Sequence, residues 1–479
     1  MGRHGLPAWT GLPLGFPEAV LVKLAELQYA PNSVFRFQSL LDRPWAAFLD
    51  SGSERGAHGR YDILTADPYI TITTRGAVTE IRTRDDARHS NEDPLAIVAK
   101  ALSPRVDAVP GVPFAGGALG HLGYDLGRRF EHLPSQAEAD IGMPELAIGI
   151  YDWAVVVDHE RRRAWLVGQG RDAKTFDEWE ALQRRVESGS SAVLPAFEVV
   201  SAVEASFDSD TYADAFRAIQ DHIRRGDCYQ VNLTQRFTAR ARGDAWHAYL
   251  QLRQINPAPF SAYLKHPAGT ILSSSPERFL RLKGGHVQTR PIKGTRPRDA
   301  DKARDQRLSH DLAASAKDRA ENVMIVDLLR NDLGKSCVPG SIHASKLFSV
   351  ESFASVHHLV STVEGRLRPD QHAVDLIRGC FPGGSITGAP KLRSMQIIEA
   401  LEPYRRSVYC GAIGYIGFDG DMDTNVAIRT LLKADDRIHA WAGGGIVADS
   451  VLEAEYQESF DKAAALLAVL HSRDTQAAG

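Results

Sequence analysis

The chain has 479 residues, 43% of them apolar and 24% charged, with a net charge of −4, which allows a large buried core and excludes a single small module. Its Lys and Arg residues are dispersed, so there is no basic patch for nucleic acid or an anionic membrane, and no apolar run approaches the length of a membrane span. Four widely spaced cysteines and the absence of an apolar leader in MGRHGLPAWTG argue against a disulfide framework and secretion, so we predict a cytoplasmic globular protein whose partners are small molecules or protein.

The first part of the chain, from about residue 15 to 168, predicts a mainly antiparallel sheet. Its apolar runs are short and are separated by turn-forming residues. The predicted strands are WAAFLDSG, RYDILTADPYITITT, GGALGHLGYDLG and YDWAVVVDHERRRAWLVG. A charged helix near 176–187 and the Ser- and Gly-rich linker ESGSSAVLP follow. We therefore predict an N-terminal, sheet-rich domain over 1–200, with a boundary near 195–205.

The second part opens with a predicted helix that is followed directly by a strand. The apolar residues on one helical face are Tyr212, Phe216, Ile219 and Ile223. Ser209 or Asp210 is the expected cap, and Gly226 the expected stop. In the strand 228–236, the apolar Tyr229, Val231 and Leu233 form a core face and alternate with polar residues that begin with Gln230. One strand face is therefore polar, and it either lines a cavity or meets water.

Strands and helices alternate over the remainder. The predicted strands are TILSSSPERFLRL, VYCGAIGYIGF, TNVAIRTLLKA and RIHAWAGGGIVA. The predicted helices lie near 311–331, 372–379, 390–401 and 450–470. Strands in hairpin order indicate an α+β fold rather than a doubly wound parallel sheet. We predict a second domain over 206–471 and a short tail over 472–479.

Two segments imitate familiar sites but lack the residues that those sites need. In GGSITGAPK, Gly383 and Gly388 have P-loop spacing, but Ala389 and Pro390 replace the Lys and Ser/Thr that clamp phosphate and magnesium. DGDMDTN begins like a calcium loop, but Thr424 replaces the glycine of its sharp turn. We interpret this second segment as a hairpin turn between two strands.

Seven segments together resemble the catalytic domain of the chorismate-utilising enzymes. In chain order they are SSPERF, PIKGTRPR, KDRAENVMIVDLLRNDLG, VHHLVSTVEG, FPGGSITGAPK, AIRT and GGGIVADSVLEAEYQESFDKA. The resemblance covers nearly all of 206–471, and GRYDILTADP and GGALGHLGYDLGRRFE extend it into the first part. It implies two packed, mostly antiparallel β-sheets with helices on the outside, the fold of anthranilate synthase component I.

The resemblance also implies a magnesium site, whose ligands map onto Glu321 and Glu458, with Glu455 beside them. Hard carboxylate oxygens suit Mg²⁺, which keeps some water and takes a further ligand from the substrate. From helical spacing alone, Glu458 and Lys462 would be an ordinary i,i+4 surface pair. The matched motif favours the metal site instead.

For the other site residues, the resemblance implies an acid and a set of substrate contacts. Glu277 is the expected acid for the departing 4-hydroxyl, with a pKa raised by its surroundings. His358 corresponds to the family histidine beside the reacting ring. The expected substrate-binding residues are Thr387, Gly388, Tyr409, Arg429, Gly443, Gly444, Gly445 and Lys462.

Two positions indicate a branch of the family. Gln230 stands where the isochorismate and salicylate synthases have a water-activating lysine, and an amide cannot act as a base at neutral pH. Lys293 stands where anthranilate synthases read PIAGT and the aminodeoxychorismate synthases have lysine. The resemblance thus favours amination at C4 of chorismate, with Lys293 as a covalent nucleophile or, alternatively, an anchor for the substrate anion.

We have further expectations about the source of ammonia and about the function of the first part of the chain. None of the cysteines has the glycine-flanked setting of a glutaminase nucleophile, so we expect ammonia from a separate glutamine amidotransferase subunit. Anthranilate synthase component I remains an alternative function. A silent, tryptophan-binding regulatory or scaffold subunit is a second alternative, because Ser51 in AFLDSG lies near the tryptophan motif of relatives.

Overall fold

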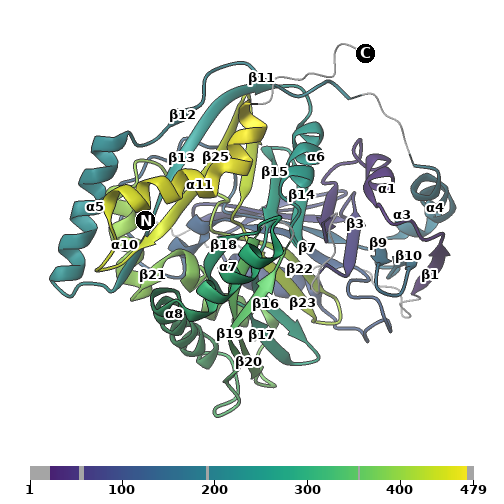
Figure 1. Ribbon diagram of the computed structural model, residues 1–479. Coiled ribbons are helices and arrows are strands. Elements are labelled where there is room, and N and C mark those ends of the chain that lie inside the picture. The colour runs from purple at the N-terminus through teal and green to yellow at the C-terminus, as the bar shows by residue number, and fades with distance from the viewer. Residues whose placement is uncertain (1–21, 53–58, 190–193, 354–355, 472–479) are drawn as a thin grey trace, which may run out of the picture.

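The computed structural model describes residues 22–52, 59–189, 194–353 and 356–471. Within these ranges the strands form two large sheets, and neighbouring strands run antiparallel. Helices cover the outer faces (Figure 1). The predicted α+β class with two packed antiparallel sheets is confirmed. The predicted tail over 472–479 and part of the predicted linker lie outside the described residues.

The first sheet has 13 strands among the described residues. In spatial order they are β1 (Lys23–Leu27), β10 (Arg163–Gly168), β9 (Trp153–Asp158), β3 (Tyr61–Thr65), β2 (Ala47–Asp50), β14 (Phe260–His266), β15 (Gly269–Ser275), β24 (Thr430–Ala434), β25 (Arg437–Ile446), β13 (Gln230–Arg242) and β11 (Glu198–Val199). Two short strands, β12 (Glu204–Ala205) and β21 (Gly388–Ala389), also pair with β13.

The second sheet has 12 strands in the described ranges. In spatial order they are β18 (Ile292–Pro297), β20 (Val356–Arg366), β17 (His286–Thr289), β16 (Arg278–Lys283), β23 (Met422–Val426), β22 (Ala412–Gly417), β7 (Gly117–Leu122), β8 (Leu146–Tyr151), β4 (Ile70–Arg75), β5 (Val78–Thr83) and β6 (Ala87–Ser90). Strand β19 (His343–Ser352) pairs with β20. The β22–β23 hairpin confirms the turn interpretation of DGDMDTN.

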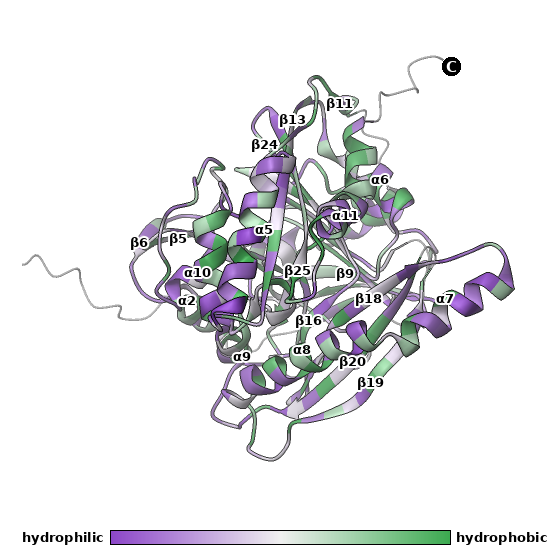
Figure 2. Ribbon diagram, turned by 60° about the vertical axis from the view of Figure 1, so that its left-hand side comes forward, coloured by the Kyte–Doolittle hydropathy of each residue, from purple (hydrophilic) through white to green (hydrophobic). Residues whose placement is uncertain are grey.

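The helices pack around this pair of sheets. They are α1 (Val34–Gln38), α2 (Pro94–Leu102), α3 (Ala173–Asp177), α4 (Trp179–Ser188), α5 (Ser209–Arg224), α6 (Ala245–Ile255), α7 (Lys302–Ala314), α8 (Ala316–Gly334), α9 (Ala373–Cys380), α10 (Lys391–Leu401) and α11 (Leu452–His471), with 3-10 turns η1 (Tyr124–Arg129) and η2 (Gly384–Ile386). Helix α7 is largely hydrophilic and projects from the body (Figure 2). No described helix is long and apolar enough to cross a membrane.

The main core lies between the two sheets. Ile63 and Ile271 of the first sheet and Leu280 and Ile413 of the second belong to one buried apolar cluster. A second cluster fills the space between the first sheet and helices including α1, α4, α6 and α11. Burying the apolar face of each sheet against the other is the main driving force for this arrangement.

Both predicted domains contribute strands to both sheets. Strand β2, from the first part of the chain, pairs with β14 of the second part. Likewise β7 pairs with β22. The boundary near 195–205 thus divides the chain, but each sheet contains strands from both sides of it.

Two local predictions near the start of the second part need correction. Helix α5 is capped by Asp208, whose side chain accepts from Thr211 N in a capping box, and not by Ser209 or Asp210. Strand β13 begins at Gln230, and Tyr229, predicted to face the core, is 72% exposed. The polar face of β13 is buried rather than wet: the backbone N–H and hydroxyl of Thr234 donate to Glu402 Oε1 at 2.9 and 2.8 Å.

Candidate active site

The residues that the family resemblance selects come together where both sheets meet two helices. Lys293 lies on β18, His358 on β20 and Glu321 on α8. Helix α8 packs against β18 and β20, and α11 packs against β25 of the other sheet. Lys293 lies within electrostatic range of Glu321, Glu277, Glu458 and Lys462. Segments nearly 200 residues apart therefore share one charged site.

Glycine on β25 makes room for the carboxylates of α11. A Cβ on Gly444 would lie 3.1 Å from Glu455 Oε2 and 3.4 Å from Glu458 Oε1, so any side chain here would crowd them. Lys462 Nζ lies 2.5 Å from Glu458 Oε1 and donates to the carbonyl of Gly443 at 3.0 Å. The i,i+4 pair anticipated from helical spacing is formed, but it faces the glycines of β25.

The three carboxylates differ in their electrostatics. Burial raises the pKa of Glu321, and Asp318 and Glu455 raise it further. Burial and then Glu458 raise the pKa of Glu455, against the hydrogen bond from Ser450. Burial also opposes ionisation of Glu458, but Lys462 and other lysines bring its pKa below the ordinary value. A cation would relieve the mutual repulsion of these groups.

The carboxylates of Glu321, Glu455 and Glu458 are the candidate ligands of a metal ion. Among the described residues, no three His, Cys, Asp or Glu side chains are gathered closely enough to hold a metal by themselves. The donor chemistry of Glu321, Glu455 and Glu458 nevertheless suits Mg²⁺, which binds few protein oxygens and retains water. The magnesium assignment stays a prediction.

Glu277 and Lys293, the proposed acid and nucleophile, both have altered pKa values. Glu277 is 5% exposed, and burial raises its pKa to about 7 although Ser385 and Lys293 oppose the rise. Burial lowers the pKa of Lys293, as does Lys462. The predicted rise for Glu277 is confirmed, but burial causes it, with no contribution from carboxylate neighbours.

Two arginines that follow Lys293 in the sequence are paired with carboxylates. Arg296 Nη2 lies 2.9 Å from Asp318 Oδ2, and Arg298 Nε lies 2.8 Å from Asp305 Oδ1. Both arginines are at least one-third exposed at the side chain. The leading cause of the lowered pKa of Lys293 is burial.

His358 is held in its neutral form. Burial lowers its pKa to about 4, and Arg429 contributes to the shift. Its Nδ1 lies 3.0 Å from the hydroxyl of Thr295, which is directly opposite on β18. Because one nitrogen is occupied by Thr295, the other, Nε2, is the one that can face a ligand.

Arg429 is a cation of the site that forms no ion pair within the described residues. Within the described ranges it has no carboxylate partner, whereas its electrostatic neighbours include Tyr409 and Glu458. Burial lowers the pKa of Arg429. Tyr409 is buried and stacks on Trp441, with ring centroids 6.0 Å apart. A guanidinium with no ion pair of its own is suited to clamp a substrate carboxylate.

A second group of backbone positions surrounds Gln230. Gly388 pairs with Val231, next to Gln230 on β13, and Gly445 pairs with Asn232. The side-chain nitrogen of Gln230 is buried, approaches Gly445, and has no hydrogen-bond partner in the described residues. Thr387 is fully buried, and its hydroxyl donates to the carbonyl of Gly383 at 3.1 Å. That hydroxyl proton is committed to the local turn.

The sequence-based prediction missed three residues that contact the site groups. Thr295 bonds to His358, Ser450 Oγ donates to Glu455 Oε1 at 2.6 Å, and Ser385 Oγ donates to Glu277 Oε1 at 2.8 Å. Thr295 lies two positions after Lys293 on β18, a strand that the sequence analysis did not predict. The other two lie in turns, where periodicity gives no signal.

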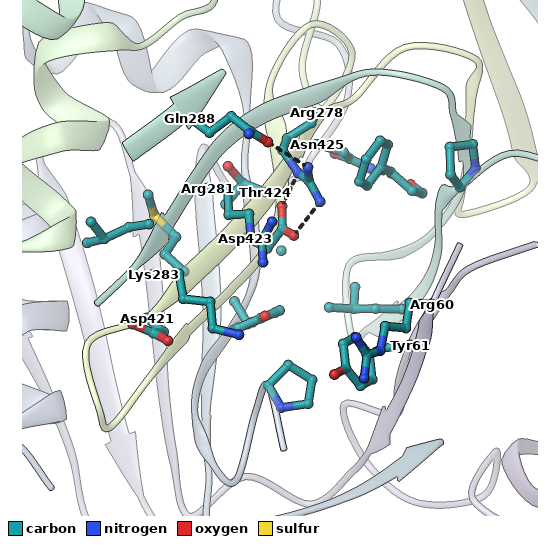
Figure 3. Close-up of a pocket in the computed structure, with 18 of the residues that line it drawn as sticks. Arg60, Tyr61, Arg278, Arg281, Lys283, Gln288, Asp421, Asp423, Thr424 and Asn425 are labelled. Atoms are coloured by element: carbon teal, nitrogen blue, oxygen red, sulfur yellow. Dashed lines mark hydrogen bonds and ion pairs between the residues drawn. The ribbon is translucent and has the colours of Figure 1, made fainter. Parts of the chain in front are cut away.

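A separate cavity of about 1090 Å³ lies between the two sheets (Figure 3). None of the predicted catalytic, substrate-binding or metal-binding residues lines it. On one wall, Arg278 Nε lies 2.9 Å from Asp423 Oδ1, while Arg281 and Lys283 extend nearby without an ion pair in the described chain. This cavity is thus distinct from the candidate active site.

Ser51 lies at the edge of this cavity rather than in its wall. Its hydroxyl donates to Asp62 Oδ1 at 2.6 Å, and its neighbour Asp50 lines the cavity. Asp50 is buried and lies 2.5 Å from Arg253 Nε. His159 Nε2 lies 2.7 Å from Asp62 Oδ2. A role of Ser51 in tryptophan binding stays a prediction.

Comparison with known proteins places the chain in a family. The sequence profile described as "chorismate binding enzyme" matches residues 53–468. The chain is 49% identical to aminodeoxychorismate synthase component 1 of Klebsiella aerogenes over 94% of its length and 99% of the relative's. It is 37% identical to anthranilate synthase component 1 of Thermus thermophilus over 93% of this chain and 96% of that one.

The fold agrees with these sequence relationships. The structure resembles that of anthranilate synthase component I from Streptococcus pneumoniae TIGR4 with a TM-score of 0.76 and 31% identity, covering 85% of this chain and 92% of that one. The fold that the family resemblance implied is therefore confirmed. The chain belongs to the chorismate-binding enzyme family.

Proposed function

We propose that the chain is component I of aminodeoxychorismate synthase, which replaces the 4-hydroxyl of chorismate with an amino group on the route to p-aminobenzoate and folate. The observation that carries this proposal is Lys293, a partly buried amine on β18 within electrostatic range of Glu277 and Glu321. The relative at 49% identity bears this name, whereas the anthranilate synthase relative is more distant at 37%.

The ionisation of Glu277 and Lys293 suits the first displacement. A protonated Glu277, whose pKa is about 7, gives its proton to the departing hydroxyl, because hydroxide leaves poorly. The neutral amine of Lys293 forms a bond to ring C2 while the C4–O bond breaks and water leaves. Burial lowers the pKa of Lys293 and so increases the fraction of free amine.

The second displacement returns the new group to C4. Ammonia forms the C4–N bond, the bond between C2 and Lys293 breaks, and Lys293 recovers its amine. The carboxylate of Glu277 takes the proton that ammonia loses. The net change is chorismate plus ammonia to 4-amino-4-deoxychorismate plus water, so two allylic shifts leave the amino group at C4.

Substrate anions need compensating positive charge. We assign the enolpyruvyl carboxylate to Arg429 and Tyr409, because Arg429 has no competing ion pair in the described chain. Glu321, Glu455 and Glu458 would hold Mg²⁺, which when bound neutralises the ring carboxylate. His358, held neutral, would contact the ring without adding charge.

We propose further that a separate glutamine amidotransferase subunit supplies ammonia. Burial raises the pKa of all four cysteines, Cys228, Cys337, Cys380 and Cys410, which disfavours the thiolate that a glutaminase needs. The relatives' name, component 1, is consistent with a second component. A cytoplasmic location is part of the same proposal, and four unpaired cysteines support it.

Product identification tests the proposal. The purified chain is incubated with chorismate, Mg²⁺ and ammonium, and the products are separated and identified by mass and absorbance. 4-Amino-4-deoxychorismate is the expected product, with no turnover when glutamine replaces ammonium. Anthranilate as the main product would establish the alternative function. No consumption of chorismate would favour the silent regulatory subunit.

A further inference from the structure

A rigid turn lies between the acid and the amine of the candidate site. It is formed by 383–387, in the GGSITGAPK segment that has P-loop spacing but no phosphate-binding residues. The hydroxyl of Thr387 donates back to Gly383 O at 3.1 Å, and the buried Arg406 donates to Ile386 O at 2.8 Å. A Cβ on Gly384 would lie 2.5 Å from Leu328 of α8, so the turn packs tightly on the helix that carries Glu321.

Ser385, at the middle of this turn, contacts both reactive groups. Its hydroxyl donates to Glu277 Oε1 at 2.8 Å, and its backbone carbonyl accepts from Lys293 Nζ at 3.3 Å. Glu277 lies in the connection between β15 and β16, Lys293 lies on β18, and no hydrogen bond joins the two side chains directly in the described chain. Ser385 is a contact that both groups share, in addition to the backbone hydrogen bond between Ile292 and the carboxyl of Glu277.

We propose that Ser385 is a positioning residue that aligns Glu277 and Lys293 for concerted protonation and attack. This inference rests on the proposed function. Because Ser385 donates to Oε1, the transferable proton of Glu277 is disfavoured on that oxygen. Because its carbonyl accepts one N–H of Lys293, the direction of the amine is fixed by the same turn.

The role predicts a specific change in the pH dependence. A hydrogen bond from Ser385 favours the charged form of Glu277, so its removal raises the pKa of that carboxyl further. In Ser385→Ala, the limb on which activity falls with rising pH should move upward by about one unit, since a hydrogen bond to a charged group has about that strength. Loss of alignment should also lower kcat roughly 10-fold.

The experiment compares Ser385→Ala, Ser385→Thr and Ser336→Ala with the parent chain. Ser336 is a buried serine whose hydroxyl donates to Asp375 O at 3.2 Å, outside the site, so it controls for the loss of a buried hydroxyl. Initial rates are measured from pH 6 to 9 at a fixed concentration of free ammonia. We also measure the chorismate-derived mass on the Lys293 peptide without ammonia.

Ser385→Thr, which keeps the hydroxyl, should retain the parent pH limb, and Ser336→Ala should match the parent throughout. An unshifted limb and parent kcat in folded Ser385→Ala would overturn the proposal. If Ser385→Ala does not fold, Ser385→Cys, with similar volume and a weaker donor, is measured against the same criteria. Failure of the parent chain to aminate chorismate would instead contradict the proposed function, so the two failures are distinguishable.

Discussion

The candidate active site and the cavity between the sheets differ in how their charged side chains are held. In the active site, Lys462 reaches Glu458 at 2.5 Å and Ser385 contacts both Glu277 and Lys293, so charged groups are held by one another and by a turn. In the cavity, about 1090 Å³ is open and Arg281 and Lys283 project from one wall (Figure 3).

The two regions also differ in how burial acts on their titratable groups. Burial raises the pKa of Glu277 to about 7 and lowers that of Lys293, so each pKa moves toward neutrality. The cavity wall has ion pairs such as Arg278–Asp423, which stabilise each other's charge. The following predictions test this difference, from the largest effect to the smallest.

The largest effect is expected from the carboxylates of α8 and α11. Glu321→Ala and Glu458→Ala should each lower kcat by about 10³-fold, because each removes a proposed ligand of a charge-neutralising metal. Excess chelator should have a similar effect on the parent chain. Glu453→Ala, at an exposed position of α11, is the matched control and should keep full activity. Undiminished turnover in chelator would remove the metal from the mechanism.

Lys293→Ala should lower 4-amination by about 10²-fold or more, roughly 3 kcal/mol of barrier, as expected for loss of an activated nucleophile or positioned charge. The chorismate-derived mass on the PIKGT peptide should disappear. Turnover is followed by product chromatography and the adduct by peptide mass spectrometry. If the variant aminates at the parent rate and the parent shows no adduct, Lys293 is at most a spectator of binding.

Glu277→Gln should stabilise the protein while inactivating it. The folded-state pKa of Glu277 is about 7 against an ordinary 4.5, so the folded chain holds a proton that the unfolded chain releases. The free energy of unfolding therefore falls as pH rises from about 4.5 to 7. At pH 8 the variant should be more stable by about 3 kcal/mol, with no difference near pH 4. Denaturant unfolding at both pH values measures this, and equal stabilities at pH 8 would show that Glu277 is ionised without cost.

The smallest effect is expected at the cavity. Arg281→Ala and Lys283→Ala remove charges that have no ion pair in the described chain, so both variants should keep kcat within about twofold and unfolding free energy within about 0.5 kcal/mol. Steady-state kinetics and denaturant unfolding provide the two values. A tenfold change in kcat would reveal that the cavity is coupled to the active site, against the separation described above.

The sequence predicted the elements well and their long-range pairing poorly. Alternating apolar residues identified the strands, and the β22–β23 turn followed from local composition. The pairing of β2 with β14 crosses the boundary near 195–205, and it depends on surfaces far apart in the chain. Tyr229 was misassigned because alternation does not reveal where a strand begins.

For the site, motif resemblance located residues that local patterns could not. Helical spacing alone predicted that Glu458 and Lys462 form an ordinary surface pair. The position of Gly444 in the structure shows that this pair faces β25. The pairing of Ser385 with Glu277 joins turns 108 residues apart, which no periodicity encodes.

Because early and late strands alternate in the sheets, some early strands must wait for their partners during synthesis. Strand β7 can acquire its neighbour β22 only after almost 300 further residues have been made. At typical translation rates this interval is roughly 15–60 s, during which the edge of β7 has no partner. Unpaired edges invite association with other chains. A chaperone would therefore be needed most while only the N-terminal part of the chain has been made. At that stage the residues of the candidate active site have not yet been synthesised.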